Sequence, residues 1–351
     1  MHYLPILPII LSTSIICITA CSPKSEYQRI EGKTMGTSYH ITFKANEQDI
    51  TAIKSVIDER LDDVNQSLST YIKDSTISKF NRLPSNTPLT IDKDFIKVFN
   101  DSQTIFTASN GSFDPTVYPL VELWGFGAQM SVERLQSPPT DDEVNALKNR
   151  IGFEKTVLQG NKLHKTHDGV GLDFSAIAKG YGVDVIASVL SEQYKINDYM
   201  VEIGGEVATK GKNDKGKPWT IAIDAPILNS SVQDREIFTT ISQQENQTLH
   251  LATSGGYRNS VEFNGVRYSH TINPSTAKPV VNSAPSVTVM HDSVALADGW
   301  ATALTAVPYI DALKMANKHN IKAIFIITQA DKKGFELVKS DAFVQSEKVK
   351  K

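Results

Sequence analysis

Two oxygen-bearing side chains stand four residues apart in the segment ALADGWATAL, residues 295–304. On a helix, Asp298 and Thr302 share one face, because residues at i and i+4 are neighbours there. The rest of the segment is mostly Ala, Leu and Trp, which predicts a buried helix, and a buried carboxylate needs a partner. A hard cation such as Mg²⁺ suits this pair, because it prefers oxygen ligands and no Lys or Arg lies within one turn. Spacing alone favours a solvated Asp and a Thr bonded back to the backbone, and the apolar surroundings shift the interpretation toward the cation.

The segment LDFSAIAKGYGVD, residues 172–184, places a carboxylate where we expect a strand to end and a helix to begin. Asp173 is either the N-cap of that helix or a carboxylate that holds the polar edge of a ligand, beside helix N–H groups that favour phosphate. Gly180 and Gly182 each cost about 1 kcal/mol of helix propensity relative to Ala. Their presence predicts that a ligand or a neighbouring segment approaches this helix closely.

Other segments are also richer in Gly, Asp, Ser and Thr than packing requires, and each falls at a strand end or a helix start, where functional loops concentrate. They are MGTSYH (35–40), GSFDPTVYPLVELWGFG (111–127), TSGGYRN (253–259) and YSHTINP (268–274).

The elements that must position these segments follow from hydrophobic periodicity. Apolar residues recur at helical spacing in residues 50–68, 92–110, 138–150 and 293–306, and strand-like segments lie between them without regular alternation. This pattern predicts an α+β fold of mixed or antiparallel sheets flanked by helices, not a doubly wound sheet. No long linker divides the chain after residue 28, so we expect one domain over residues 29–351.

Charge and motif content exclude several classes of protein. The chain of 351 residues has a formal net charge of −3, from 36 basic and 39 acidic side chains. It lacks the clustered basic excess of a nucleic-acid-binding protein, so we expect no nucleic acid among its partners. It also contains no zinc-type Cys/His cluster and no Walker-type phosphate loop.

The first 21 residues are largely apolar and contain no Lys, Arg, Asp or Glu. They are too short and too interrupted by Pro for a good membrane span, and fit an export signal better. The ending ITAC resembles the lipobox of bacterial lipoproteins. It implies removal of a signal peptide, residues 1–20, lipidation of Cys21 and a polar tether over residues 21–28. We therefore expect an exported, periplasm-facing lipoprotein anchored in the inner or outer membrane; the alternative is a plain secretory signal with an incidental Cys.

Taken together and in this order, the segments MGT, LSTY, FDPTV, LDFSAIAKGYGVD, TSGGYRN, SHTINP and ADGWATAL resemble the ApbE family of periplasmic FAD:protein FMN transferases. The resemblance runs from about Glu31 to near residue 330. It implies an ApbE-like domain with FAD in a cleft between strand ends and helix N-termini. A Ser or Thr hydroxyl of a target protein attacks the phosphorus on the FMN side of FAD, FMN becomes attached through a phosphoester, and AMP leaves. The implied targets are flavin-carrying subunits of NADH:quinone or ferredoxin:NAD oxidoreductases.

The resemblance also implies roles for individual residues of this chain. The metal ligands are the side chains of Asp298 and Thr302 and the backbone carbonyl of Ala176. The expected FAD contacts are Met35, Tyr71, Ser112, Phe113, Asp114, Asp173, Lys179 and Ile272.

Asp298 and His270 are the residues for which we expect a catalytic role. Histidine is the commonest general base because its pKa lies near neutrality. The alternative for His270 is a strand histidine whose hydrogen bonds are satisfied by a neighbouring carbonyl.

Three positions depart from the family pattern. Some relatives have Asp in place of Ala301, which leaves open whether one or two Mg²⁺ ions bind. Some have an acidic residue in place of Lys179, and Gly is frequent in place of Tyr118. Two other functions are compatible with the same motifs: a Mg²⁺-dependent FAD pyrophosphatase, and a non-enzymatic FAD-binding lipoprotein.

We predict that Cys21→Ser releases the protein from the membrane as a soluble periplasmic protein, because it removes the lipidated thiol. Cell fractionation measures this directly. A variant that still fractionates with membranes would show that the anchor lies elsewhere.

Overall fold

The computed structural model describes residues 27–45, 49–127, 137–228, 234–256, 260–263, 266–280, 284–329 and 333–348. Cys21, the export signal and residues 257–259 of TSGGYRN lie outside these ranges. No helix within them combines the length and the apolar character needed to cross a bilayer.

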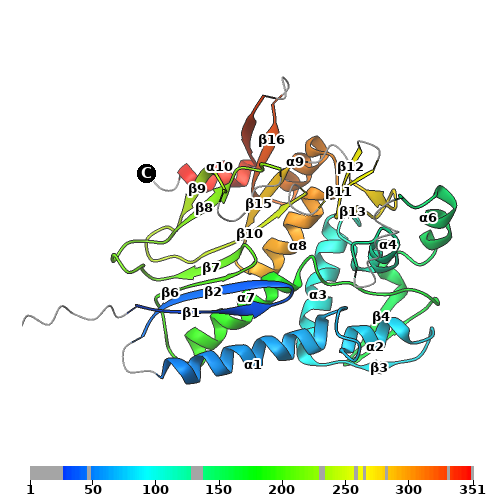
Figure 1. Cartoon of the computed structure of the whole chain (residues 1–351), viewed down its shortest axis with the longest axis horizontal. Coiled ribbons are helices and arrows are strands. Elements are labelled where there is room, and N and C mark those ends of the chain that lie inside the picture. Colours follow the sequence, from blue (N-terminus) through cyan, green and yellow to red (C-terminus); the bar gives the residue numbers. More distant parts are fainter. Residues whose placement is uncertain are drawn as a thin grey trace, which may run out of the picture.

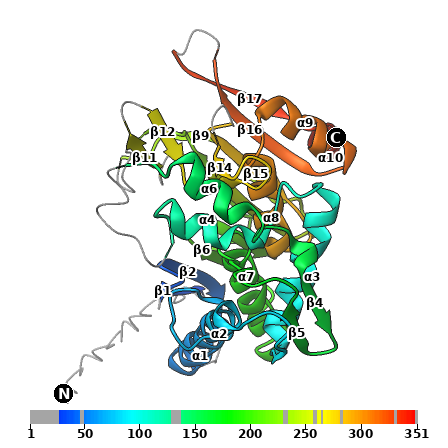
Figure 2. The same cartoon turned by 90° about the vertical axis from the view of Figure 1, so that its right-hand side faces the viewer.

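An eight-stranded antiparallel sheet runs through the molecule (Figure 1). Its strand order is β1-β2-β6-β7-β10-β15-β16-β17. The strands are β1 (Tyr27–Thr34), β2 (Thr37–Lys44), β6 (Tyr199–Ile203), β7 (Glu206–Lys210), β10 (Leu249–Gly255), β15 (Ser286–Met290), β16 (Lys322–Thr328) and β17 (Phe335–Lys339). In Figure 2, α1 and the β16–β17 hairpin lie at opposite ends of the molecule.

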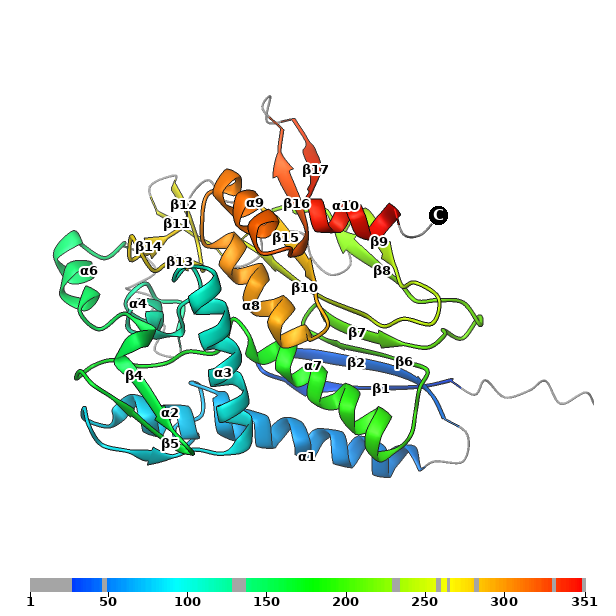
Figure 3. The ribbon, with the colours of Figure 1, turned by 180° about the vertical axis from the view of Figure 1, so that it is seen from behind.

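Most of the helices lie on one face of this sheet, with α7 and α8 crossing it in the view of Figure 3. Because side chains alternate between the faces of a strand, Ala323 and Phe325 of β16 join the core under the helices, whereas Ile324 and Ile326 join a separate core on the opposite face. The helices are α1 (Ile50–Leu68), α2 (Thr76–Arg82), α3 (Lys93–Ala108), α4 (Tyr118–Leu123), α6 (Asp141–Lys148), α7 (Ala178–Ser188), α8 (Val294–Thr305), α9 (Tyr309–Lys318) and α10 (Asp341–Lys348).

Smaller sheets complete the fold. The hairpin of β8 (Thr220–Asp224) and β9 (Ile237–Ser242) packs on the opposite face of the large sheet, where Ile223 and Ile241 meet Val207 and Leu251. Phe343 of α10 joins the same core. The remaining strands are β3 (Leu89–Thr90), β4 (Thr156–Gln159), β5 (Lys162–Lys165), β11 (Ser260–Phe263), β12 (Val266–Ser269), β13 (Ile272–Asn273) and β14 (Lys278–Pro279).

The structure confirms the α+β class and places the expected helices within a few residues of their predicted bounds. A two-residue turn joins β1 to β2, and both Met35 and Gly36 have positive φ, as a type I′ turn requires. One expectation is wrong. Residues 172–174 belong to no strand, and the helix that follows begins at Ala178, several residues after Asp173.

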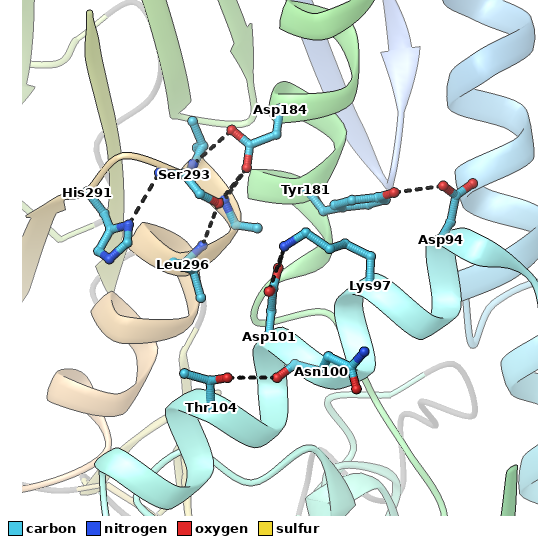
Figure 4. A network of polar contacts seen from close by, with 12 residues as sticks. Asp94, Lys97, Asn100, Asp101, Thr104, Tyr181, Asp184, His291, Ser293 and Leu296 are labelled. Carbon is cyan, nitrogen blue, oxygen red and sulfur yellow. Dashed lines mark hydrogen bonds and ion pairs between the residues drawn. The ribbon is translucent and has the colours of Figure 1, made fainter. Parts of the chain in front are cut away.

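Helices α7 and α8 are joined by two carboxylates. Asp184 on α7 accepts hydrogen bonds from the hydroxyl of Ser293 (2.7 Å) and from the backbone N–H groups of Val294 (2.9 Å) and Ala295 (3.0 Å), as Figure 4 shows at the start of α8. In return, Asp298 on α8 accepts the backbone N–H of Gly180 (3.1 Å). An acidic group at a helix N-terminus is favourable because it satisfies N–H groups that have no partner within the helix.

The two glycines of α7 serve this packing. A Cβ atom on Gly180 would lie 2.3 Å from the backbone oxygen of Val294, so only glycine lets the helices approach this closely. A Cβ on Gly182 would meet the flexible end of Met35, whose Cε lies 2.9 Å away. Of the two alternatives that the sequence left open, a ligand or a neighbouring segment, the structure places a neighbouring helix at Gly180.

We predict different effects on stability for alanine at these two positions. Gly180→Ala should lower the free energy of unfolding by about 1–3 kcal/mol, because its Cβ forces the α8 backbone away. Gly182→Ala should stay within about 1 kcal/mol of wild type, because the gain in helix propensity offsets the displacement of Met35. Urea unfolding measures both, and equal stabilities of the two variants would contradict the assigned α7–α8 contact.

Candidate active site

A cavity of about 1790 Å³ opens where the ends of α7 and α8 meet the strand ends of the large sheet. It exceeds the roughly 300–1,000 Å³ of most small-molecule pockets, so it has room for a dinucleotide. Every site residue predicted from the sequence, except Cys21, lines it: Met35, Tyr71, Ser112, Phe113, Asp114, Asp173, Ala176, Lys179, His270, Ile272, Asp298 and Thr302. Segments far apart in the sequence therefore converge on one site.

The Asp298–Thr302 pair lies on α8 as predicted from its spacing. Asp298 is only 3% exposed, so it is not a solvated surface carboxylate. Thr305, one turn further along, bonds back to the carbonyl of Ala301 (2.7 Å). In contrast, the hydroxyl of Thr302 makes no hydrogen bond to any residue that the structure describes, and it borders the cavity. The interpretation as a solvated Asp with a back-bonded Thr is thus wrong for both residues.

The carbonyl of Ala176 is also left without a helical partner. In a regular helix the N–H of Gly180 would donate to it, but this N–H donates to Asp298 instead. A carboxylate, a hydroxyl and a free carbonyl are the oxygen ligands that Mg²⁺ accepts. Within the described part of the chain there is no group of three or more His, Cys, Asp or Glu side chains that could hold a metal by themselves. The available donors therefore fit a hard cation that also takes oxygen ligands from a bound diphosphate.

Lys179 lies between two buried carboxylates. Its Nζ is 3.6 Å from Oε1 of Glu206, at the start of β7, and 3.8 Å from Oδ2 of Asp298. Burial raises the pKa of both carboxyl groups, and the lysine ammonium only partly opposes this. Burial would lower the pKa of Lys179, but Asp298 and Glu206 outweigh it and raise that pKa.

Glu206 was not predicted from the sequence as a site residue, although it lines the cavity and is 2% exposed. One signal could have identified it: an acidic residue that directly follows Gly204 and Gly205 and opens the apolar strand β7. Both glycines have positive φ, which marks a tight turn before the carboxylate.

Asp173 and Asp114 lie on neighbouring loops. The N–H of Asp173 donates to the carbonyl of Pro115 (2.9 Å), which ties the two loops together. Asp173 accepts hydrogen bonds from the N–H (2.8 Å) and hydroxyl (2.5 Å) of Ser175, so it closes a local turn and is not the N-cap of α7. Asp114 is 7% exposed, and its burial raises its pKa to about 6 despite two hydrogen bonds from Thr116.

The remaining predicted contacts differ in exposure. Tyr71 is 66% exposed at the cavity wall, whereas the side chains of Phe113 and Ile272 are almost fully buried in hydrophobic cores. Any contact of Phe113 with a cofactor therefore involves mainly its backbone. The hydroxyl of Ser112 donates to the carbonyl of Ser109 (3.0 Å). His270 directly follows β12 and is not part of a strand.

Comparison with known proteins agrees with this geometry. Residues 35–325 match the ApbE family. A FAD:protein FMN transferase from Vibrio cholerae is 38% identical over 94% of this chain and 96% of its own length, and one from Haemophilus influenzae is 37% identical over 95% and 96%.

Solved structures agree as well. A mutant of the flavin transferase ApbE from Vibrio cholerae superposes with a TM-score of 0.81 at 38% identity, covering 91% of this chain and 99% of that one. The apo form of the flavinyl transferase ApbE from Pseudomonas stutzeri gives 0.79 at 29% identity, covering 91% and 96%. This chain therefore belongs to the ApbE family.

Proposed function

We propose that the protein is a Mg²⁺-dependent FAD:protein FMN transferase, which attaches FMN through a phosphoester to a Ser or Thr of an exported target and releases AMP. The observation that carries this proposal is the convergence of the predicted cofactor, metal and catalytic residues on one cavity, with the carboxylate of Asp298 buried at its wall. The names of the similar proteins support the same reaction.

The reaction is a phosphoryl transfer, in which positioning and charge neutralisation matter most. The acceptor oxygen bonds to the phosphorus on the FMN side, the bond from that phosphorus to the oxygen of AMP breaks, and AMP leaves with this oxygen. When bound, Mg²⁺ neutralises the charge of the diphosphate. Asp298, Thr302 and the carbonyl of Ala176 would hold the ion, and His270 would accept the proton of the attacking hydroxyl.

The other cavity residues would hold FAD. Asp173 would hydrogen-bond the nucleotide, and Tyr71 would pack against a ring of the cofactor. Lys179 would face the diphosphate with a positive charge. The side chain of Met35 and the backbone of Ile272 and of residues 112–114 would complete the binding surface.

The proposed partners and location follow from the sequence. We place the protein on the periplasmic side of a bacterial membrane, anchored through lipidated Cys21. Its targets would be flavin-carrying subunits of NADH:quinone or ferredoxin:NAD oxidoreductases.

A single assay tests the reaction. The purified protein is mixed with FAD, Mg²⁺ and a flavin-acceptor subunit of an NADH:quinone oxidoreductase, and both AMP and protein-bound flavin are measured. Equal amounts of the two products support the transferase. AMP and free FMN without an adduct would make the protein a FAD pyrophosphatase, and the absence of both products would leave it a FAD-binding protein.

We predict that Asp298→Asn raises the Mg²⁺ concentration needed for AMP release by about tenfold or more, because it keeps the size of the side chain but removes the charge that holds the cation. Thr302→Val should have a smaller effect, since it removes a neutral ligand. Thr305→Val is the matched control: it changes a buried threonine of the same helix that is absent from the cavity wall. An unchanged Mg²⁺ requirement in Asp298→Asn would show that Asp298 is not a ligand of the ion.

A further inference from the structure

The charges around Asp298 do not balance. The carboxylates of Asp298 and Glu206 are 3% and 2% exposed, and Lys179 is the cation that both contact. When both carboxyl groups are ionised, two negative charges and one positive charge leave, among the described residues, an excess of one negative charge at the buried wall of the cavity. A buried charge without compensation is unfavourable, so this cluster favours an additional cation.

Glu206 has a carboxylate oxygen without a hydrogen-bond partner in the described part of the chain. Its Oε2 is buried and accepts no hydrogen bond from any residue within the described ranges. Buried polar atoms in native proteins almost always have a partner. Since Glu206 borders the cavity, this oxygen indicates that the cluster is complete only when something positive or hydrogen-bonding is bound there.

Lys179 is held loosely. Its contacts of 3.6 and 3.8 Å are longer than a charged hydrogen bond of about 2.7–2.9 Å. Several other ion pairs of this protein are shorter, for example Arg60 with Asp94 at 2.5 Å. The lysine side chain is 28% exposed, and its stem passes over Gly204, where an added Cβ would lie 3.3 Å from Cδ of Lys179. The ammonium group therefore lies between the two carboxylates without a short hydrogen bond to either of them.

We propose that Lys179 is the resting counter-ion of the cation site, and that Glu206 limits how strongly this lysine competes with a divalent cation for Asp298. The inference rests on the proposed function in one respect, the placement of Mg²⁺ at Asp298. In the ligand-free protein the ammonium partly neutralises Asp298. When the cation binds, Glu206 retains the ammonium, which then faces the diphosphate of FAD. The cluster thus changes from a net charge of about −1 to about +1, which suits an anionic substrate.

The proposal predicts opposite changes in Mn²⁺ affinity for substitutions at Lys179 and Glu206, neither of which is a ligand of the ion. Lys179→Met should tighten Mn²⁺ binding to the FAD-free protein by about tenfold or more, because the competing positive charge is gone. Glu206→Gln should weaken Mn²⁺ binding by about tenfold, because Lys179 then pairs with Asp298 alone. The double variant should return to within about threefold of wild type, since the two charges cancel.

Isothermal titration calorimetry with Mn²⁺, supported by electron paramagnetic resonance of the free ion, measures these affinities without turnover. Lys210→Met is the control for loss of a positive charge, because Lys210 lies on the same strand as Glu206 but not at the cavity. Glu31→Gln, on the exposed side of β1, is the control for loss of a negative charge. Thermal unfolding of each variant verifies that it is folded.

Equal or weaker Mn²⁺ binding in Lys179→Met than in wild type would overturn the proposal, including the case in which neither protein binds the ion. Adding Asp298→Asn to Lys179→Met should abolish the gain in Mn²⁺ affinity. A gain that persists in this double variant would also overturn the proposal, because the ion would then bind elsewhere. If these binding tests fail, the proposed transferase reaction is unaffected, because it is tested separately by the assay of AMP and covalent flavin. If that assay fails while the Mn²⁺ affinities are as expected, the transferase proposal is rejected and the proposed role of Lys179 as counter-ion is retained.

Discussion

Helix α7 approaches α8 so closely at Gly180 that the backbone N–H of one helix reaches a side chain of the other. This contact does two things at once. It fixes the carboxylate of Asp298, and it takes from the carbonyl of Ala176 the hydrogen bond that a regular helix would give it. One turn further along α7, Asp184 holds the N-terminus of α8. The proposed cation ligands are therefore positioned by helix packing and not by a flexible loop.

The large sheet supplies the other half of the site. Strand β7 begins at the cavity, so Glu206 faces Lys179 of α7 from the end of the sheet. Loops before α4 and α7 bring Asp114 and Asp173 to the same cavity, and the bond between Asp173 and Pro115 holds them together. Burial raises the pKa of Asp114 and Glu206. Burial thus disfavours the charged forms of these groups in the ligand-free protein, and a bound cation would offset this cost.

Local patterns predicted much of this from the sequence. The helices over residues 50–68 and 293–306 follow from the spacing of apolar residues, and the β1–β2 turn follows from Gly36. The identity of the cavity residues followed from the family resemblance, because Asp298, Thr302 and Asp173 lie in its motifs. Glu206 lies in none of these motifs, and the motif that ends at Asp184 does not reveal the partner of that carboxylate. Their importance depends on which helix or strand end lies opposite, and that is a property of the tertiary structure. The same reason explains Gly180, whose neighbour is a backbone more than a hundred residues away.

The central claim is that α7 and α8 together build a divalent-cation site at Asp298. Anomalous X-ray scattering from crystals of the protein soaked with Mn²⁺ and FAD tests it most directly. We expect a peak bounded by the carboxylate of Asp298, the hydroxyl of Thr302 and the carbonyl of Ala176, at the roughly 2.0–2.2 Å typical of small divalent cations with oxygen ligands. A peak elsewhere in the cavity, or none while FAD is clearly bound, would contradict the account.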